Sequence, residues 1–127
     1  MENGKYVLIV EDDADAAEVT CDVVEWLGYR SVVAHRGKDA IRIAREVSPE
    51  IVLLDLGLPD ARGPHVARAL RDGAGPGALS IIAVTGFSAP EMLEAAYGAG
   101  VDDVVVKPVT IASLRDALAR ARPRTAA

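Results

Sequence analysis

Short runs of apolar residues alternate with longer amphipathic runs along almost the whole chain. The first run, residues 6–10, is continuously apolar and is followed by three acidic residues. This pattern is typical of a strand that is buried on both faces of a parallel sheet. In the next segment, 14–27, apolar residues recur at spacings of three or four positions, which predicts a helix with one apolar face that stops at Gly28.

The alternation continues and predicts four more strand–helix pairs. Apolar, β-rich runs predict strands over residues 30–34, 51–54, 81–84 and within 101–106. Amphipathic runs predict helices over residues 38–47, 64–71, 89–97 and 110–121. The Gly- and Pro-rich stretch 72–77 is expected to be a flexible loop, and the last residues, 122–127, a frayed tail.

Each connection between consecutive strands is long enough to hold a helix, so the strands are expected to run parallel. Five such units predict a three-layer α/β sandwich, with helices on both faces of one sheet. They are too few for an eight-stranded barrel. The length of 127 residues suits a single domain, which we place at residues 1–121, before the tail 122–127.

Polar residues stand where the predicted strands end. Glu11 and Asp12 follow the first strand, Asp55 the third, Thr85 the fourth and Lys107 the fifth. Ligands of open parallel sheets bind outside the carboxyl ends of the strands, so these side chains are expected to converge. Clustered carboxylates repel one another, and a divalent cation offsets that repulsion. An oxygen-only ligand set favours Mg²⁺, or Mn²⁺, over zinc.

A carboxylate placed beside Mg²⁺ and a lysine is suited to attack phosphorus. The metal and the ammonium group neutralise the phosphoryl oxygens, and a hydroxyl such as that of Thr85 can hydrogen-bond one of them. Carboxylate nucleophiles of this kind form aspartyl phosphates. The predicted cluster therefore points to phosphoryl chemistry on Asp55.

Four motifs in order make the chain resemble a response regulator receiver domain of two-component signalling, over residues 5–121. They are the acidic pair Glu11-Asp12, then Asp55-Leu56-Gly57-Leu58-Pro59 with Gly63 downstream, then Thr85-Gly86, and finally Val106-Lys107-Pro108. Each motif alone has little specificity, but the four together at the expected strand ends are highly specific. The resemblance implies a flavodoxin-like, doubly wound sheet of five parallel strands in the order 2-1-3-4-5, with five helices.

The resemblance also implies a role for each site residue. Asp55 would be the phosphoacceptor, and Lys107 would pair first with Asp55 and then with the phosphoryl group. Thr85 would move toward a phosphoryl oxygen. Asp12 would bind Mg²⁺ directly and Glu11 mainly through water, while Asp55 and the carbonyl group of Gly57 would complete the metal ligands. The Lys107–Pro108 peptide bond would be cis.

A receiver would take its phosphoryl group from a histidine kinase or a histidine phosphotransfer protein. The new charge would alter the face built by the fourth helix, fifth strand and fifth helix, which would then bind a protein target or a second copy in a phosphorylation-dependent homodimer. Such a domain is not an enzyme beyond its own phosphorylation and dephosphorylation. Two settings stay open: a stand-alone regulator, and a receiver cut from a hybrid histidine kinase.

Two departures from the family pattern limit what can be carried over. Val104 stands three positions before Lys107, where many receivers have an aromatic residue that moves with Thr85. Gly57 and Phe87 stand at positions that border the route of attacking water. Gly57 offers no side chain to orient water, and Phe87 can shield the phosphoryl group, so we expect slow autodephosphorylation.

Two other functions compete with the phosphoacceptor hypothesis. One is a pseudo-receiver that acts purely as an interaction module. Because Val104 replaces the usual aromatic residue, this alternative stays open for the output step. The other is a Mg²⁺-dependent aspartyl-phosphate phosphohydrolase of the haloacid dehalogenase type. Such enzymes have a second aspartate two residues after the nucleophile, where this chain has Gly57.

Composition narrows the class of protein further. Hydrophobic residues make up 50% of the chain and charged residues 26%, as in globular proteins. The net charge of −5 argues against direct binding of nucleic acid. No apolar run approaches the ~20 residues that cross a bilayer, and the N-terminus does not resemble a signal peptide. We therefore expect a cytoplasmic protein that makes no membrane contact.

Several residues near these motifs are given ordinary structural roles. Asp13 is expected to cap the first helix, and Trp26 to pack over the edge of that helix, with a role as partner anchor as the alternative. Arg68 and Arg71 are expected to form a solvated face. His35 and His65 are expected at exposed loop or helix positions, and of the two only His35 is near enough in the pattern to approach the acidic cluster.

Overall fold

The computed structural model describes residues 6–58, 63–74, 79–86 and 90–121. Five strands and five helices alternate along these residues. The strands are β1 (Tyr6–Val10), β2 (Arg30–Ala34), β3 (Ile51–Asp55), β4 (Ser80–Thr85) and β5 (Asp103–Val106). The helices are α1 (Ala14–Trp26), α2 (Gly37–Val47), α3 (Gly63–Ala74), α4 (Pro90–Gly98) and α5 (Ile111–Arg120).

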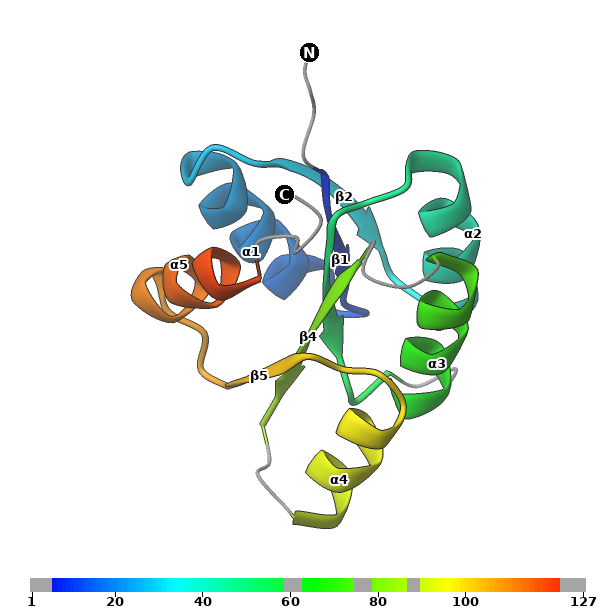
Figure 1. Ribbon diagram of the computed structural model, residues 1–127. Helices are drawn as coiled ribbons and strands as arrows, with labels where there is room; N and C mark the ends of the chain where they lie inside the picture. The colour runs from blue at the N-terminus through cyan, green and yellow to red at the C-terminus, as the bar shows by residue number, and fades with distance from the viewer. Residues whose placement is uncertain (1–5, 59–62, 75–78, 87–89, 122–127) are drawn as a thin grey trace.

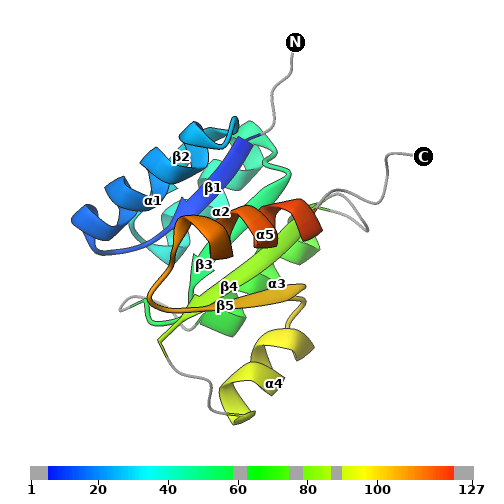
Figure 2. The same cartoon turned by 90° about the vertical axis from the view of Figure 1, so that its left-hand side faces the viewer.

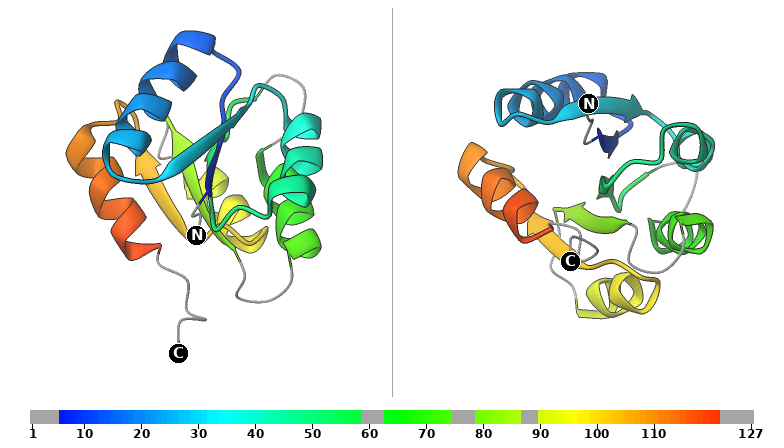
Figure 3. Two further views of the ribbon diagram at one scale, coloured as in Figure 1. Left: turned by 90° about the horizontal axis from the view of Figure 1, so that it is seen from above. Right: turned by 45° about the horizontal axis from the view of Figure 1, so that its top comes forward.

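All five strands form one parallel sheet in the order β2-β1-β3-β4-β5. Helices α1 and α5 cover one face of the sheet, and α2, α3 and α4 cover the other (Figure 1 and Figure 3). Figure 2 shows α1 and α5 side by side in front of the sheet. The predicted doubly wound, three-layer fold with strand order 2-1-3-4-5 is therefore confirmed.

The apolar runs form strands because both faces of the sheet are covered. Every residue of β3 is buried, as in a strand at the centre of a three-layer fold. Successive side chains of β1 enter different cores: Leu8 and Val10 pack toward α2, α3 and α4, whereas Val7 and Ile9 pack toward α1 and α5. This alternation follows from the two-residue period of a strand.

The helix boundaries follow local signals in most places. Asp13 caps α1 by accepting hydrogen bonds from the backbone N–H groups of Asp15 and Ala16, which confirms its predicted role. Gly28 follows α1 with a φ of 103°, a conformation that glycine adopts without steric cost. None of the helices in the described residues is long and apolar enough to cross a membrane.

The loop predicted over residues 72–77 is partly wrong. Asp72, Gly73 and Ala74 belong to the last turn of α3, while residues 75–78 lie outside the described residues, as does the predicted tail 122–127. A glycine in a helix costs about 1 kcal/mol relative to alanine, so the sequence alone favours an earlier end. The helix continues because its C-terminal turn is held by Arg71.

Arg71 is not part of a solvated face, contrary to the sequence-based expectation. Its side chain is 23% exposed and forms an ion pair with Asp102. The same guanidinium donates hydrogen bonds to the carbonyl oxygens of Leu79 and Gly100. Arg68 donates to the carbonyl oxygen of Gly98, at 2.9 Å. These bonds join α3 to the end of α4 and to the residues just before β4 and β5, a role that helical spacing does not reveal.

Trp26 also differs from its predicted packing role. It is 76% exposed at the end of α1, so it does not cover the helix edge. Cys21 of the same helix is half-buried, and its Sγ atom lies 2.6 Å from Ser31 Oγ. Helix α4 has one buried residue, Ala96. Each of the other four helices has at least two among the described residues.

Candidate functional site

Four strands end at the same edge of the sheet, and a polar residue stands at or just after each end. Asp55 and Thr85 are the last residues of β3 and β4. Glu11 and Asp12 follow β1, and Lys107 follows β5. The parallel pairing aligns these strand ends. The structure therefore gathers the predicted side chains at one edge.

The three carboxylates converge closely. Glu11, Asp12 and Asp55 each offer one carboxylate oxygen, and the three oxygens lie within 4.8 Å of one another. Asp55 and Glu11 are buried, at 7% and 8% exposure. Asp12 is exposed. The cluster is therefore shielded on the side of the sheet and reaches solvent through Asp12.

Lys107 supplies the positive charge of the cluster. Its Nζ atom lies 3.4 Å from Asp55 Oδ2 and 3.8 Å from Glu11 Oε1. The backbone N–H of Lys107 donates to the carbonyl oxygen of Thr85 at 2.8 Å, which holds the end of β5 against the end of β4. The Lys107–Pro108 peptide bond is cis, as the family resemblance implied.

Backbone donors fix the orientation of the two buried carboxylates. Asp55 Oδ1 accepts a hydrogen bond from the N–H of Gly57 at 2.9 Å. Glu11 Oε2 accepts one from the N–H of Asp13 at 3.2 Å. Asp13 thus serves both α1, through its side chain, and the cluster, through its backbone. The second role was missed because a backbone donor leaves no signal in residue type.

His35 is exposed, as expected, and lies beside the cluster without joining the carboxylates. Its Nδ1 atom lies 3.0 Å from the carbonyl oxygen of Glu11. Because a carbonyl oxygen only accepts, Nδ1 is the donor in this bond. The imidazole of His35 therefore helps to position the backbone of Glu11.

Burial raises the pKa of the Glu11 carboxyl above its ordinary value. The negative charge of Asp55 raises this pKa as well, whereas the N–H of Asp13 and the charge of Lys107 lower it. Desolvation and like charge both disfavour an ionised carboxylate. The described residues of the site thus form an acidic cluster with one nearby cation. A further positive charge would stabilise the ionised carboxylates.

An apolar cavity of about 580 Å³ adjoins the cluster on the side of α1 and α5. Besides Glu11, Asp55 and Lys107, the residues that line it include Ala16, Val19, Thr20, Pro108, Val109 and Leu114. This apolar lining accounts for the desolvation of Glu11. The sequence did not indicate the cavity, because its walls come from ordinary positions of two amphipathic helices.

The donor set fits a hard divalent cation. Among the described residues, three carboxylates face a single lysine, and the side chains that could bind a cation there offer oxygen. Mg²⁺ is bound in proteins by one or two carboxylates with water and substrate oxygens, and it disfavours the soft ligands that select zinc. Because Asp12 is exposed, a metal held there would also be open to water. The N–H of Gly57 donates to Asp55 Oδ1, so Gly57 lies next to this carboxylate.

Comparison with known proteins identifies the family. The sequence model of one family, the response regulator receiver domain, matches residues 7–119. The chain belongs to this family. Receiver domains are modules of two-component signalling. In this receiver, Glu11, Asp12 and Asp55 cluster at the edge of the sheet where the family motifs stand.

Several receivers resemble this one along most of the chain. The polar-differentiation response regulator DivK of Brucella ovis is 31% identical over 107 residues, which cover 84% of this chain and 87% of DivK. A CheY-like receiver from Methylobacillus flagellatus is 31% identical with a TM-score of 0.84, over 94% of this chain and 99% of its own.

A third relative was solved with a bound metal. It is the receiver domain of a sensor histidine kinase from Pseudomonas aeruginosa, and it has a magnesium ion coordinated in its active site cleft. It is 30% identical with a TM-score of 0.83, over 93% of this chain and 97% of its own. The likeness thus extends over the strands that carry the acidic cluster.

Proposed function

We propose that this receiver is a phosphoacceptor signalling domain that takes a phosphoryl group onto Asp55. The donor is the phosphohistidine of a histidine kinase or of a histidine phosphotransfer protein. The observation that carries the proposal is the environment of Asp55: its buried carboxylate lies 3.4 Å from Lys107 Nζ and within 4.8 Å of two further carboxylate oxygens. A buried aspartate that only capped a loop would not need these neighbours.

The transfer is a displacement at phosphorus. A carboxylate oxygen of Asp55 forms the new O–P bond while the N–P bond of the phosphohistidine breaks, and the imidazole leaves with the electron pair and takes up a proton. Lys107 is placed to neutralise charge on the phosphoryl oxygens. The N–H of Gly57, which holds Asp55 Oδ1 at 2.9 Å, orients the nucleophile.

Glu11, Asp12 and Asp55, with the carbonyl group of Gly57, would hold Mg²⁺ in this reaction. When bound, the metal supplies charge that neutralises the phosphoryl oxygens. Mn²⁺ satisfies the same oxygen donors. The raised pKa of Glu11 supports a cation requirement, because a second positive charge stabilises the ionised carboxylate.

The output of the domain is proposed to run from Thr85 to the face built by α4, β5 and α5. This face exposes Tyr97, Val106 and Ile111, at 49%, 50% and 50%. Val104 is half-buried and packs against the core under α2, α3 and α4. Val104 is therefore a packing residue. We expect the acidic cluster to be coupled to the output face through Thr85 and the backbone between β4 and α4.

The charges on the same face are partly used within the chain. Arg120 and Asp103 form an ion pair at 2.8 Å, so these two residues are not free for a partner. A phosphorylation-dependent homodimer through this face would depend on the exposed apolar residues. The cytoplasm, where histidine kinases present their phosphohistidine, is the proposed compartment.

Intact mass spectrometry after incubation with Mg²⁺ and acetyl phosphate tests the proposal. One added phosphoryl group is expected on the wild-type protein and on Asp22→Asn, which removes an exposed carboxylate of α1. No adduct is expected for Asp55→Asn or in the presence of a chelator. An adduct that persists in Asp55→Asn would overturn the assignment of the acceptor.

The same experiment separates the two competing functions. Absence of any adduct, from acetyl phosphate and from a phosphorylated histidine phosphotransfer protein alike, would favour a pseudo-receiver. Steady release of phosphate from p-nitrophenyl phosphate, lost in Asp55→Asn, would favour a phosphohydrolase. Gly57 stands where such an enzyme needs its general acid, so we expect no such turnover.

A further inference from the structure

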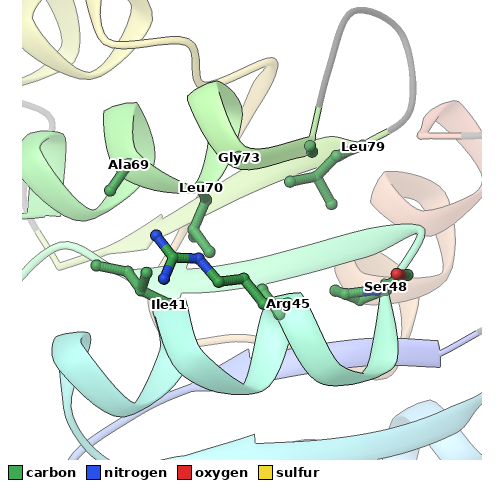
Figure 4. A pocket seen from close by; sticks show the side chains of 10 residues that line it. Ile41, Arg45, Ser48, Ala69, Leu70, Gly73 and Leu79 are labelled. Atoms are coloured by element: carbon green, nitrogen blue, oxygen red, sulfur yellow. The ribbon is translucent and has the colours of Figure 1, made fainter.

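A second cavity lies between α2 and α3, on the face of the sheet opposite α1 and α5 (Figure 4). Its volume is about 300 Å³, at the lower end of the range of roughly 300–1,000 Å³ found for small-ligand sites. Leu70 and Leu79, which line it, are only 3% and 5% exposed. The cavity therefore reaches from the surface down to the core.

The lining of this α2–α3 pocket has a simple chemistry. Two of the lining residues have polar side chains, Arg45 and Ser48. No acidic side chain lines the pocket among the described residues. The rest of the lining is apolar or lacks a functional group: Ile41, Ala44, Pro49, Ala69, Leu70, Gly73, Ala74 and Leu79. An occupant would thus meet an apolar surface, one cation and one hydroxyl.

The charge of Arg45 has no counter-charge in the part of the chain that the structure describes. The neighbouring Arg42 takes the two nearby carboxylates, with Asp39 and Glu46 each at 3.6 Å. Figure 4 shows Arg45 extending from α2 along the pocket, with its guanidinium on the side of Ile41 and Leu70. A basic residue in the last turn of a helix is favoured by the helix dipole, but the dipole does not explain an apolar cavity beside it.

We propose that the α2–α3 pocket binds a small amphipathic carboxylate. The apolar body of the ligand lies against Leu70 and Leu79, where it leaves water. The carboxylate accepts two parallel hydrogen bonds from the guanidinium of Arg45, a geometry for which arginine is suited. Ser48 lies at the other end of the pocket from the guanidinium (Figure 4), so the carboxylate is bound by Arg45.

Other ligand classes fit this lining less well. A divalent cation needs acidic oxygens, which the pocket lacks among the described residues. A nucleotide carries several phosphate charges, whereas the described residues of the lining offer one cation. An amine with an apolar chain would meet the like charge of Arg45.

Octanoate is the probe for this proposal, in a titration followed by amide NMR of the uniformly ¹⁵N-labelled chain. Saturable shifts confined to α2, α3 and residue 79 are expected, with a dissociation constant of about 1 mM, ordinary for a ligand of this size. Octylammonium, which has the same chain and the opposite charge, is expected not to bind. 1-Octanol is expected to bind roughly tenfold more weakly than octanoate.

Two pairs of variants locate the site. Arg45→Gln is expected to weaken octanoate binding roughly tenfold, whereas Arg42→Gln, on the same helix but outside the pocket, leaves it within about twofold. Gly73→Leu fills the pocket and abolishes binding. Gly73→Ala is its control, because a Cβ atom at Gly73 meets nothing within 4 Å, and it is expected to retain binding.

Several results would overturn the proposal. If octylammonium bound as tightly as octanoate, the binding would be apolar association that does not need a carboxylate. Unchanged affinity in Arg45→Gln or in Gly73→Leu would place the ligand elsewhere, as would shifts centred on the cavity between α1 and α5. No shifts up to about 10 mM octanoate would also overturn it. Each variant's amide spectrum reports whether that variant is folded.

Discussion

Arg71 Nη2 lies 2.6 Å from Asp102 Oδ2, and this pair joins the end of α3 to the start of β5. The same Asp102 oxygen accepts a hydrogen bond from the N–H of Ile81 at 2.8 Å. Arg71 also donates to the carbonyl oxygen of Gly100 at 2.8 Å. One side chain therefore joins the end of α3 to the chain before β4 and to the chain before β5.

Removal of Arg71 is expected to destabilise the fold. Arg71→Ala leaves Asp102 and the carbonyl oxygens of Leu79 and Gly100 without their shared donor, at a cost of about 2 kcal/mol in the free energy of unfolding. Urea unfolding measures the change. Arg115→Ala is the control, since Arg115 pairs only with the exposed Asp116 among the described residues and should cost close to nothing. Equal losses in both variants would contradict this role of Arg71.

The raised pKa of Glu11 predicts a pH dependence of stability in the metal-free protein. Because the folded state holds the Glu11 proton more tightly than the unfolded chain, the contribution of this group is most favourable below its ordinary pKa. That contribution is lost as the pH rises through the raised value. Glu11→Gln removes the titration, so its stability relative to wild type should increase as the pH rises from below the ordinary pKa of Glu11 through the raised value.

Urea unfolding at a series of pH values, with a chelator present, measures this difference. Glu18→Gln, at an exposed position of α1, is the control and should follow the wild-type profile. A stability of Glu11→Gln relative to wild type that falls with rising pH would show that Glu11 is stabilised in its ionised form instead.

Mg²⁺ is expected to stabilise the folded receiver. At ten times its dissociation constant, a ligand that binds only the folded state adds about 1.4 kcal/mol. For a domain of this size, that is a rise in Tm of about 5 °C. Thermal unfolding with and without Mg²⁺ measures the shift, and a chelator should reverse it. Asp12→Asn should lose the shift and Asp22→Asn should keep it; a full shift in Asp12→Asn would remove Asp12 from the metal ligands.

Phosphorylated Asp55, if it forms as proposed, is expected to hydrolyse slowly. A Cβ atom at Gly57 would lie 3.5 Å from Asp55 Oδ1, so a side chain there would stand beside the phosphoryl group, and Gly57 has none to orient water. Phe87, the other residue expected to matter, lies outside the described residues. Gly57→Asn is therefore expected to shorten the half-life severalfold, as followed by loss of the phosphoryl mass.

Gly57→Ala is the control for that variant, because it adds the same Cβ atom without a polar group. Its half-life should stay close to that of wild type. A wild-type half-life of seconds would contradict the slow hydrolysis, and equal acceleration in both variants would assign the effect to altered packing.

The residues that the sequence located well are those whose position follows from strand ends. Asp55 and Lys107 were predictable because a buried apolar run must stop where a charged residue follows, and parallel strands stop at a common edge. The sequence failed where tertiary contacts override local preference. Gly73 is a poor helix residue, yet it lies in α3, whose last turn contains Arg71. Trp26 is the reverse case, since a large apolar residue was expected to be covered and is 76% exposed.

Helix α4 has little apolar burial to hold it in place. Its single buried side chain, Ala96, contributes roughly 1 kcal/mol through its methyl group, whereas the bonds from Arg68 and Arg71 to Gly98 and Gly100 hold the chain at and just beyond its C-terminal end. The C-terminal end of α4 is thus held more firmly than its N-terminal end, which follows Thr85 in the chain. If phosphorylation acts through Thr85 as proposed, we expect α4 to pivot about its C-terminal end.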